Sequence, residues 1–445
     1  MKKNILLLGD YIVDEFIEDL CGINSDYKVS HIYILKRSPE NDNLIKENKI
    51  EVIRGWHDYT LLIKKSFDSD ILNDPKFQHE AFNIIKSLYR FSNDHDFFYH
   101  ETVYYELINF WIHFFEKNEI SLIIGGNPVY FDQIPILVAS KIFGIKVITR
   151  KLMAKQPEDN SFRMFFFDRN NGTAVPLFYD KEFKPSSILY PDYSKLKIRG
   201  YPRLITQILK DLYGFRVSNI LYIISNYLLF GKLKAHFKKI SVRPNLEKNY
   251  IFYPLHFDPE VVTMPEENIR ANQILNIRKI SASLPQNWYL YVKIHPFQFN
   301  YKLNFWSGEF YGNVMRYYKS IESLKYISNL ENVKIIDDSV HQKKLIKNSK
   351  AVASINGTVF LEASYLNKMI LVLGKRTIYK QFSNARYTES KNEVEKAISE
   401  LLQKDNYKSN LEKIIQDYTY DSKIPSKKQV LMKLLTHIDK SKKTC

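Results

Sequence analysis

The chain has 445 residues, of which 45% are hydrophobic, 26% charged and 14% aromatic. This composition supplies apolar side chains for about two to three packed domains, and it excludes wholesale disorder, a collagen-like repeat and a simple coiled coil. The two cysteines, Cys21 and Cys445, exclude a disulfide framework and a cysteine zinc site, so we expect a cytoplasmic protein. The net charge of +16 suits an anionic partner, but we find no RNA-binding signature, zinc-finger spacing or basic recognition helix, and we expect no nucleic-acid partner.

Strand and helix signals alternate along the first half of the chain. Asn4–Leu8 predicts the first strand, and long aromatic helices are predicted over Phe77–Phe91 and Val103–Lys117. The segments ISLIIGG, PILVASKIF and IKVIT then predict a strand, a helix and a strand, which make a βαβ unit of a parallel sheet. Because ligands of such sheets bind at the carboxyl ends of the strands, we expect Asp10 and Asn127 at the rim of a site.

A basic segment follows, and we place it between two domains as residues 212–248. From Leu212 to Leu246 it holds no acidic residue, and its part Val217–Phe230 predicts an amphipathic helix. Basic residues accumulate there at Arg216, Lys232, Lys234, Lys238, Lys239 and Arg243. The segment is either a solvated helix between domains or a contact with an anionic membrane surface, which would place the protein peripherally on the inner face of the cytoplasmic membrane.

The second half repeats the alternation from Tyr250 onward. Strands are predicted for YIFYPL, WYLYVKI, VKIID, AVASI and MILVLG, separated by helices at 268–283, 314–329, 341–348 and 359–366. Three short amphipathic helices are predicted after Lys391. We therefore expect an α/β fold with two Rossmann-like doubly wound domains that face a cleft, residues 1–211 and 249–390, and a C-terminal helical tail at 391–445.

Three polar clusters lie at predicted strand ends of the second half. The first is PLHFDPE, directly after the YIFY strand. It is either a proline-stiffened turn in which Asp258 caps a backbone group, or a catalytic cluster that brings His256, Asp258 and Glu260 into the cleft.

The second cluster is VKIHP, at the end of the WYLYVKI strand. Alternate residues of a strand share one face, so Lys293 and His295 are predicted to point the same way. An ammonium and an imidazole at this place can neutralise a phosphate leaving group, and Pro296 ends the strand and holds the histidine at the rim. The alternative is a histidine with a structural role.

The third cluster is SINGTVFLEASYLNK. A strand is predicted to end at Ser354 and a helix to begin at about Thr358, so hydroxyl and N–H groups of Ser354, Asn356, Gly357 and Thr358 suit phosphate oxygens. Glu362 lies one helical turn further, where a carboxylate can accept hydrogen bonds from ribose hydroxyls. The alternative is a capped helix with an ordinary tight turn and a surface glutamate.

In this order, FYPLHFDPEVVTMP, LPQNWYLYVKIHP, NVKII and SINGTVFLEASYLNKMILVLG resemble the capsule and surface polysaccharide biosynthesis family that includes the bacterial Kdo transferases. The segment SLIIGGNPVYFDQIPILVASKIFGIKVI is similar to the N-terminal βαβ unit of the same family, although Asn127-Pro128 stands where the family often has Pro-His. The resemblance implies a GT-B glycosyltransferase, with the acceptor on the N-terminal domain and the nucleotide-sugar donor on the C-terminal one.

The resemblance also implies roles for individual donor-side residues. His295 and Pro296 match a His-Pro pair whose histidine contacts the nucleotide phosphate, and Ser354 to Thr358 match a phosphate-binding turn. Glu362 matches a ribose-binding glutamate. With Lys293 beside them, these groups would stabilise the departing phosphate, so we expect no obligatory metal and no cofactor.

The sequence indicates the acceptor-binding residues less clearly than the donor-binding ones. We expect the acceptor base among Asp10, Asp14 and Glu101, with Asn127 nearby on the same rim. The favoured function is transfer of Kdo or a related acid sugar from a CMP-sugar to a glycan or glycolipid acceptor in surface polysaccharide biosynthesis. The alternatives are a CDP-polyol phosphotransferase, a UDP-sugar epimerase of related fold, and a catalytically inactive scaffold in polysaccharide assembly.

Overall fold

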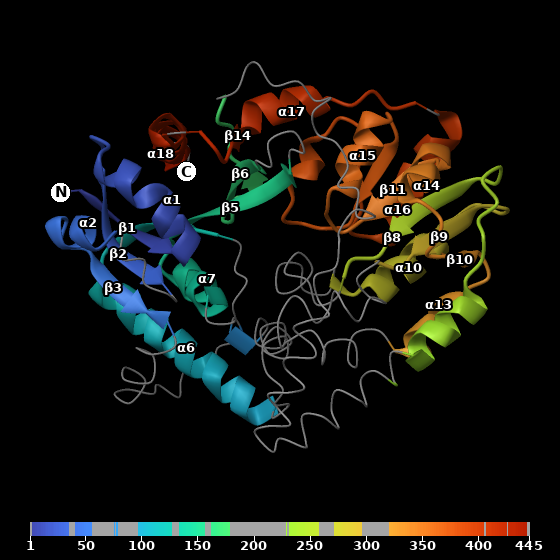
Figure 1. Ribbon diagram of the computed structural model, residues 1–445, viewed down its shortest axis with the longest axis horizontal. Coiled ribbons are helices and arrows are strands. Elements are labelled where there is room, and N and C mark those ends of the chain that lie inside the picture. Colours follow the sequence, from blue (N-terminus) through green and yellow to red (C-terminus); the bar gives the residue numbers. More distant parts are fainter. Residues whose placement is uncertain are drawn as a thin grey trace, which may run out of the picture.

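The computed structural model describes residues 2–34, 41–55, 75, 77–78, 97–126, 133–155, 162–178, 228, 231–257, 271–295, 320–404, 406–424 and 426–442. These residues form two α/β units, each built around one β-sheet (Figure 1). No helix within these ranges is long and apolar enough to cross a membrane.

The N-terminal unit is a sheet with helices on both faces. Its strand order is β14-β6-β5-β4-β1-β2-β3, in which β5, β4, β1, β2 and β3 are parallel, β6 runs antiparallel to β5, and β7 pairs with β6. The strands are β1 (Lys3–Leu8), β2 (Tyr27–Ile34), β3 (Glu51–Arg54), β4 (Ile120–Gly125), β5 (Lys146–Lys155), β6 (Phe162–Asp168), β7 (Thr173–Ala174) and β14 (Thr419–Asp421). The helices are α1 (Asp10–Cys21), α2 (Asp42–Glu47), α6 (Phe97–Lys117) and α7 (Gln133–Ile142).

The C-terminal unit is a wholly parallel sheet of order β10-β9-β8-β11-β12-β13. The strands are β8 (Tyr250–Pro254), β9 (Tyr289–Lys293), β10 (Val333–Ile336), β11 (Ala351–Ser354), β12 (Met369–Val372) and β13 (Ala385–Tyr387). The helices are α10 (Gln273–Ser281), α13 (Ile321–Ser328), α14 (Gln342–Asn348), α15 (Val359–Tyr365) and α16 (Lys391–Gln403), with a short 3-10 helix η7 (Ile378–Gln381). Successive side chains of β8 alternate between two cores, with Ile251 and Tyr253 in one and Tyr250 and Phe252 in the other.

Both sheets have the strand order of a Rossmann-like fold. In each unit the chain lays strands to one side of the first strand and then crosses to its other side, so the order reverses between β1 and β4 and between β8 and β11. Helices cover both faces, because apolar residues on the two sides of the central strands belong to separate cores. The predicted fold class, two Rossmann-like doubly wound α/β units, is confirmed.

The C-terminal residues join both units. Three helices follow Lys391 as predicted, but only α16 packs on the C-terminal sheet alone. Helix α17 (Leu411–Tyr418) leads into β14, which pairs with β6, and α18 (Lys428–Lys442) lies against α1 (Figure 1). Asp439 of α18 accepts hydrogen bonds from Lys3 and Tyr27, both at 2.9 Å.

Strand β6 belongs to the cores of both units. Met164 and Phe166 pack with α1 and α18, whereas Phe165 and Phe167 pack with Tyr250 and other core residues of the C-terminal unit. Because neighbouring residues of a strand point to opposite faces, each unit uses one face of this strand. The two units therefore share a strand rather than a mere linker.

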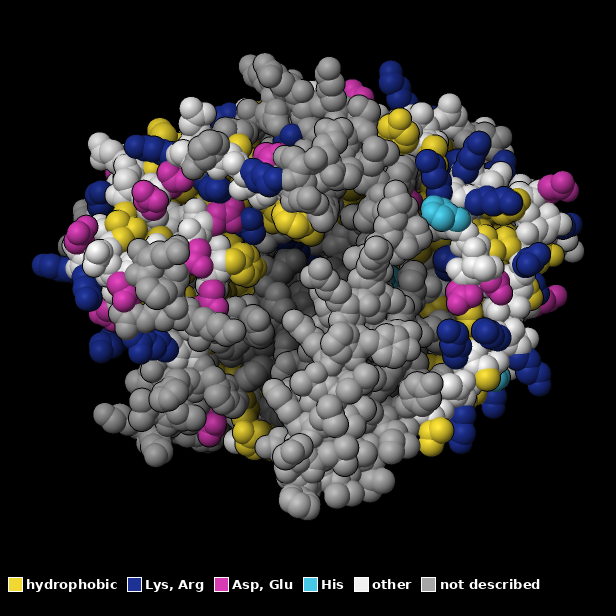
Figure 2. All heavy atoms as spheres, viewed as in Figure 1, with side chains coloured by type: hydrophobic (Ala, Val, Ile, Leu, Met, Phe, Trp, Pro, Cys, Tyr) yellow, Lys and Arg dark blue, Asp and Glu magenta, His cyan; other side chains and the backbone are white. Residues whose placement is uncertain are grey.

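Residues 231–240 of the basic segment form a surface helix of the C-terminal unit. Leu233 and Phe237 are buried in its core, and the side chains on the outer face are exposed, at Lys232, Lys234, Lys238 and Lys239. Basic side chains outnumber acidic ones on this unit, at the right of Figure 2. Residues 212–227 lie outside the described residues, as does all of the helix predicted at 77–91 except 77–78.

Candidate functional site

The three polar clusters meet at one edge of the C-terminal sheet. Strands β9, β8 and β11 are adjacent and parallel, so their carboxyl ends lie side by side. His256, His295 and Asn356 each stand two residues beyond the end of their strand. The order of the strands reverses between β8 and β11, and ligands of open parallel sheets bind in the crevice at such a point.

His256 bridges the end of β8 and the turn after β11. Its Nε2 atom lies 3.1 Å from the hydroxyl of Ser354 and accepts a hydrogen bond from the backbone N–H of Asn356 at 3.3 Å. Gly357 has a φ of 111°, and a Cβ atom on it would stand 3.3 Å from Cε1 of the imidazole. The histidine therefore packs against the turn after β11, and glycine is required both for the backbone conformation and for the space.

The backbone of His256 is itself clamped. The side chain of Gln273, at the first turn of α10 and only 2% exposed, accepts from the N–H of His256 at 2.6 Å and donates to its carbonyl at 3.2 Å. Sequence reasoning missed Gln273, because a glutamine at the start of a helix has no pattern that distinguishes it from a surface residue.

The turn after β11 is held from its other side as well. The side-chain oxygen of Asn356 accepts from the N–H of Gly357 at 2.8 Å and from the hydroxyl of Thr377 at 2.9 Å. Thr358 is exposed, and within the part of the chain that the structure describes the N–H groups of Thr358 and Val359 donate to no other residue. The turn therefore combines a rigid base with two N–H groups that no described residue engages.

Lys293, predicted to face a phosphate, contacts backbone carbonyl groups of the protein. Its ammonium donates three hydrogen bonds to carbonyl groups of the loop after β10, at Asp337 (3.3 Å), Asp338 (3.0 Å) and Val340 (2.8 Å). Burial lowers the pKa of Lys293, and the nearby Asp338 and Asp337 carboxylates oppose this. Since all three hydrogen-bond donors of its ammonium serve the protein, Lys293 supports the loop after β10.

The other predicted donor residues divide between described and undescribed positions. His295 is half-buried at the end of β9, and its ring centroid lies 6.0 Å from that of Phe257. Four predicted site residues lie outside the described residues: Asn127, Asp258, Glu260 and Pro296.

Glu362 is a half-buried residue of α15 that contacts Gln342 of α14. Burial raises the pKa of Glu362 to about 7, while a hydrogen bond from Gln342 at 3.3 Å and the charge of Lys343 oppose the shift. A carboxyl group whose pKa is raised to near neutrality by burial is a typical feature of functional sites. The position therefore differs from the surface glutamate of the alternative interpretation.

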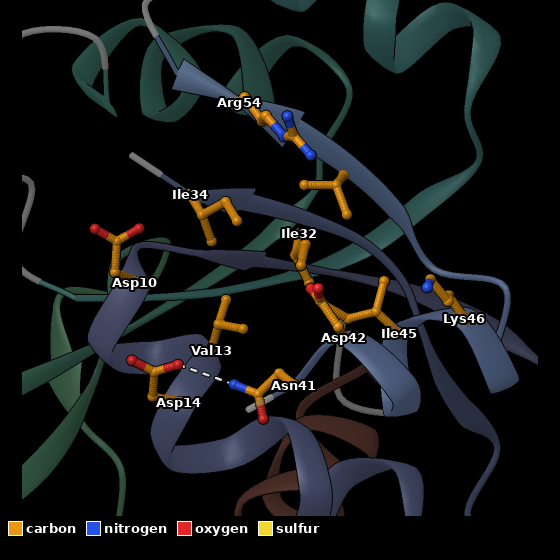
Figure 3. Close-up of a pocket in the computed structure, with 11 residues that line it drawn as sticks. Asp10, Val13, Asp14, Ile32, Ile34, Asn41, Asp42, Ile45, Lys46 and Arg54 are labelled. Atoms are coloured by element: carbon orange, nitrogen blue, oxygen red, sulfur yellow. Dashed lines mark hydrogen bonds between the residues drawn. The ribbon is translucent and has the colours of Figure 1, made fainter. Parts of the chain in front are cut away.

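Asp10 and Asp14 line a small cavity of about 60 Å³ in the N-terminal unit (Figure 3). The cavity lies between α1, α2 and strands β2 and β3, with Arg54 at the end of β3 on its opposite wall. The side chain of Asn41 donates to Asp14 at 2.9 Å. Asp10 is the first residue of α1, directly after the central strand β1, so it stands at the carboxyl edge of this sheet as predicted from its place in the chain.

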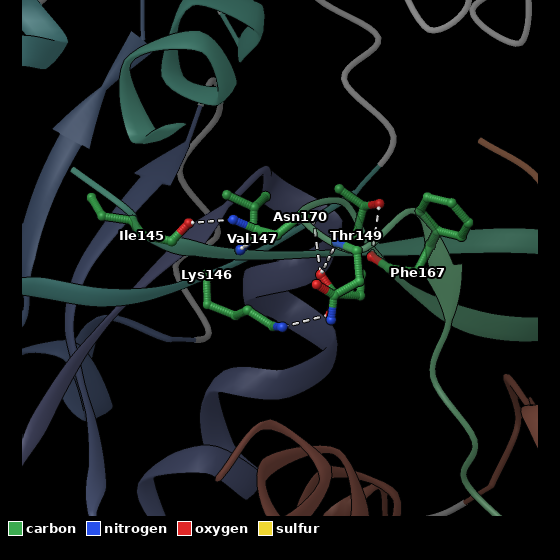
Figure 4. A network of polar contacts seen from close by, with 8 residues as sticks. Ile145, Lys146, Val147, Thr149, Phe167 and Asn170 are labelled. Atoms are coloured by element: carbon green, nitrogen blue, oxygen red, sulfur yellow. Dashed lines mark hydrogen bonds and ion pairs between the residues drawn. The ribbon is translucent and has the colours of Figure 1, made fainter. Parts of the chain in front are cut away.

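A second polar network, shown in Figure 4, has a structural role. Asp168 is fully buried and pairs with Lys146 at 2.6 Å, and it accepts hydrogen bonds from the backbone N–H groups of Asn170 and Asn171. Asn170 in turn bridges Val147 and the carbonyl of Ile145. The network closes the turn between β6 and β7 against the start of β5, far along the strand from its carboxyl end.

The two units approach each other at the carboxyl ends of their strands. Lys151 lies two residues beyond the level at which β4 ends, and its ammonium donates to the carbonyl of Arg376 at 3.2 Å. Arg376 precedes Thr377, whose hydroxyl bonds to Asn356. Within the described ranges no three His, Cys, Asp or Glu side chains gather as metal ligands would.

No protein-family model matches the chain, and no curated protein sequence matches it. Among solved structures it is similar to a UDP-GlcNAc 2-epimerase from Methanocaldococcus jannaschii, with 12% identity, 92% of this chain and 95% of that chain covered, and a TM-score of 0.28. It is also similar to the KpsC beta Kdo 2,7 transferase from Thermosulfurimonas dismutans, with 10% identity, 69% of this chain and 79% of that chain covered, and a TM-score of 0.31. A third similar structure is MnaA from S. aureus with UDP, with 13% identity, 94% of this chain and 90% of that chain covered, and a TM-score of 0.26. At this level of likeness the comparisons assign no activity, and the function is argued from this chain's own residues.

Proposed function

We propose that the protein is a glycosyltransferase that uses a nucleotide-sugar donor and binds its phosphate at the turn from Ser354 to Thr358. The observation that carries the proposal is the position of this turn. It lies at the point where the strand order of the C-terminal sheet reverses, and its base is fixed by His256. The N–H groups of Thr358 and Val359 donate to no residue in the described ranges.

The chemistry of glycosyl transfer suits these groups. As the sugar leaves its nucleotide, negative charge develops on the departing phosphate, and donors that are already in place lower the barrier. The N–H groups of Thr358 and Val359, the Thr358 hydroxyl and the His295 imidazole supply such donors. Glu362 would accept hydrogen bonds from the ribose hydroxyls, as the sequence resemblance implies.

The acceptor would bind to the N-terminal unit, with Asp10 as its general base. Asp10 stands at the carboxyl edge of the N-terminal sheet, and Asp14 lies one helical turn further along α1. The sequence resemblance favours a CMP-linked acid sugar such as Kdo as the donor and a glycan or glycolipid as the acceptor. A CDP-polyol phosphotransferase, a UDP-sugar epimerase and an inactive scaffold are the alternatives.

Nucleotide binding tests the proposal. A thermal-shift series with CMP, CDP, UDP, GDP and UMP is run on the wild type, on His295→Ala and on His113→Ala, which replaces an exposed histidine of α6 as a matched control. We expect CMP to raise the Tm of the wild type and of the control, and to raise that of His295→Ala less. A response to UDP or CDP alone supports the corresponding alternative, and no response to any nucleotide contradicts the proposed function.

We also propose that helix 231–240 contacts an anionic membrane surface. Its apolar side is buried in the C-terminal unit and its four lysines are exposed, so the contact would be electrostatic and weakened by salt. Replacing Lys232, Lys234, Lys238 and Lys239 by glutamine should abolish sedimentation with vesicles that contain phosphatidylglycerol. The matched control replaces four lysines in and near α16, at Lys391, Lys396, Lys404 and Lys408, and equal loss in both variants would contradict a specific surface.

A further inference from the structure

We infer that His256 is a positioning residue, not a catalytic one: its neutral imidazole links the end of β8 to the turn after β11 and fixes the shape of that turn. The inference rests on the proposed function in one respect, which is that the turn binds phosphate. It changes the role that the sequence suggests for His256, because it assigns the imidazole to the protein rather than to the substrate.

The hydrogen bonds of Nε2 carry the first step. The N–H of Asn356 can donate only to an unprotonated nitrogen, so Nε2 acts as an acceptor and the ring is neutral with its proton on Nδ1. The hydroxyl of Ser354 lies at 3.1 Å from the same nitrogen and supplies a second hydrogen bond. With its lone pair engaged inside the protein, Nε2 has no capacity to act as a general base on an acceptor hydroxyl.

The second step is that the imidazole is held at both ends. Gln273 bonds to both the N–H and the carbonyl of His256, which fixes the origin of the side chain. At the other end the ring lies against Gly357, whose missing side chain leaves the space that the ring occupies. Hydrogen bonds therefore connect α10 to His256 and His256 to the turn, and they restrain both the backbone and the ring of the histidine.

The third step concerns the donors. Ser354 and Asn356 flank the fully buried Ile355, so the two hydrogen bonds to His256 fix the direction in which the chain leaves β11. The N–H groups of Thr358 and Val359 follow within three residues. The direction of these two N–H groups therefore depends on His256, although His256 itself would not contact the phosphate.

Two variants separate positioning from other roles. In His256→Leu the imidazole is replaced by an apolar side chain that accepts no hydrogen bond. In His256→Gln the amide oxygen is able to accept from both Ser354 and Asn356. We measure hydrogen–deuterium exchange of the peptide that covers residues 352–358 in the full chain without ligand, and expect faster exchange in His256→Leu and near wild-type exchange in His256→Gln.

Affinity supplies the functional readout. By calorimetry on the full chain, His256→Leu should bind CMP at least about 10-fold more weakly, while its affinity for cytidine, which lacks the phosphate, changes less than about 2-fold. His256→Gln should recover most of the CMP affinity. UDP and uridine are measured in parallel, so that the result does not depend on which nucleotide the wild type prefers.

The outcomes distinguish the two proposals. If the wild type binds no nucleotide, the proposed function fails, and the exchange data still decide the role of His256. Equal exchange in all three proteins overturns the positioning role, as does an equal loss of CMP and cytidine affinity in His256→Leu. If the leucine variant does not fold, His256→Asn, whose shorter amide stops short of the turn, replaces it.

Discussion

The hydroxyl oxygen of Tyr11 lies where a side chain on Gly126 would begin, because a Cβ atom built on Gly126 would stand 1.5 Å from it. Tyr11 follows β1 and Gly126 follows β4, so the two residues meet where the strand order of the N-terminal sheet reverses. The tyrosine ring is 43% exposed, and the guanidinium carbon of Arg150 lies 5.8 Å from its centroid. In the N-terminal unit an aromatic ring thus stands where the strand order reverses. At the corresponding point the C-terminal unit has hydrogen-bond donors.

Gly126→Ala should move the Tyr11 side chain and leave the backbone in place, since the atoms nearest to the new methyl group are the far end of a residue that is 43% exposed. The expected loss of unfolding free energy is below about 1 kcal/mol, measured by urea denaturation. Adding Tyr11→Ala should recover most of this loss, and Tyr11→Ala alone serves as the control. A loss of several kcal/mol that Tyr11→Ala does not relieve would contradict this explanation.

Lys293→Met tests whether Lys293 supports the loop or binds phosphate. The variant keeps the length of the side chain but loses three hydrogen bonds to carbonyl groups, so we expect a loss of about 2–4 kcal/mol of unfolding free energy. Nucleotide affinity of the folded variant should change less than about 3-fold. Lys334→Met on the neighbouring strand β10 is the control. A large loss of affinity at full stability would restore the role predicted from the sequence.

The stability of the protein should depend on Glu362 in a defined direction. Burial raises the pKa of Glu362 to about 7 from an ordinary value of 4.5, so the folded protein keeps this proton at pH values where the unfolded chain has released it. The unfolding free energy therefore falls as pH rises from about 4.5 to about 7. Glu362→Gln removes this dependence and should exceed the wild type by roughly 2–3 kcal/mol at pH 8, with a smaller gain at pH 5.

Urea denaturation at both pH values measures this effect. The control is Glu412→Gln, which changes an exposed glutamate of α17. A gain of equal size at pH 5 and pH 8 would show that burial of the charge at Glu362 is not its cause.

Nucleotide affinity should show the opposite pH dependence. Ribose hydroxyls donate hydrogen bonds to a carboxylate better than to a carboxylic acid, so affinity for CMP should rise between pH 6 and pH 8 as Glu362 ionises. In Glu362→Gln the affinity should be lower and should rise less over the same range, because only the second ionisation of the CMP phosphate, at about pH 6, still contributes. Calorimetric titrations across this range check the prediction, and an unchanged pH profile in the variant would exclude Glu362 from the site.

Strand β6 should make the two units unfold together. Phe165→Ala and Phe166→Ala remove rings from opposite faces of this strand, one in each core, and each should cost about 3–4 kcal/mol. Because the strand is common to both cores, scanning calorimetry should show a single transition that moves to lower temperature in both variants. Two separate transitions in the wild type would contradict this coupling.

The strands of the C-terminal sheet could be predicted because parallel strands buried on both faces are short, continuous apolar runs. Their order then placed His256, His295 and the turn after Ser354 at one edge. The orientation of Lys293 could not be predicted in the same way. Alternate residues share a face only within a strand, and β9 ends at Lys293, so the backbone has left the strand before His295.

Other features depend on contacts between residues far apart in the sequence. Strand β6 (FRMFFFD) shows no alternation of apolar and polar residues because each of its faces is buried in a different core. Strand β14 has three residues and forms only because it pairs with β6, more than 250 positions earlier in the chain. Such elements have no local signal, and the sequence predicted helices alone in the C-terminal region.

The doubly buried β6 has a consequence for how this protein can be divided or recombined. A fragment that ends before α17 lacks β14 and α18. It leaves β6 paired with β5 and β7 but exposes the edge that β14 covers, and it removes the α18 residues that pack on Met164 and Phe166, which promotes aggregation. If the C-terminal unit is replaced by that of another protein, the new unit must have an apolar surface that packs against Phe165 and Phe167 of β6. The two units therefore have to be exchanged together. Substitutions in surface loops are a simpler way to alter the specificity of this protein than exchange of a whole unit.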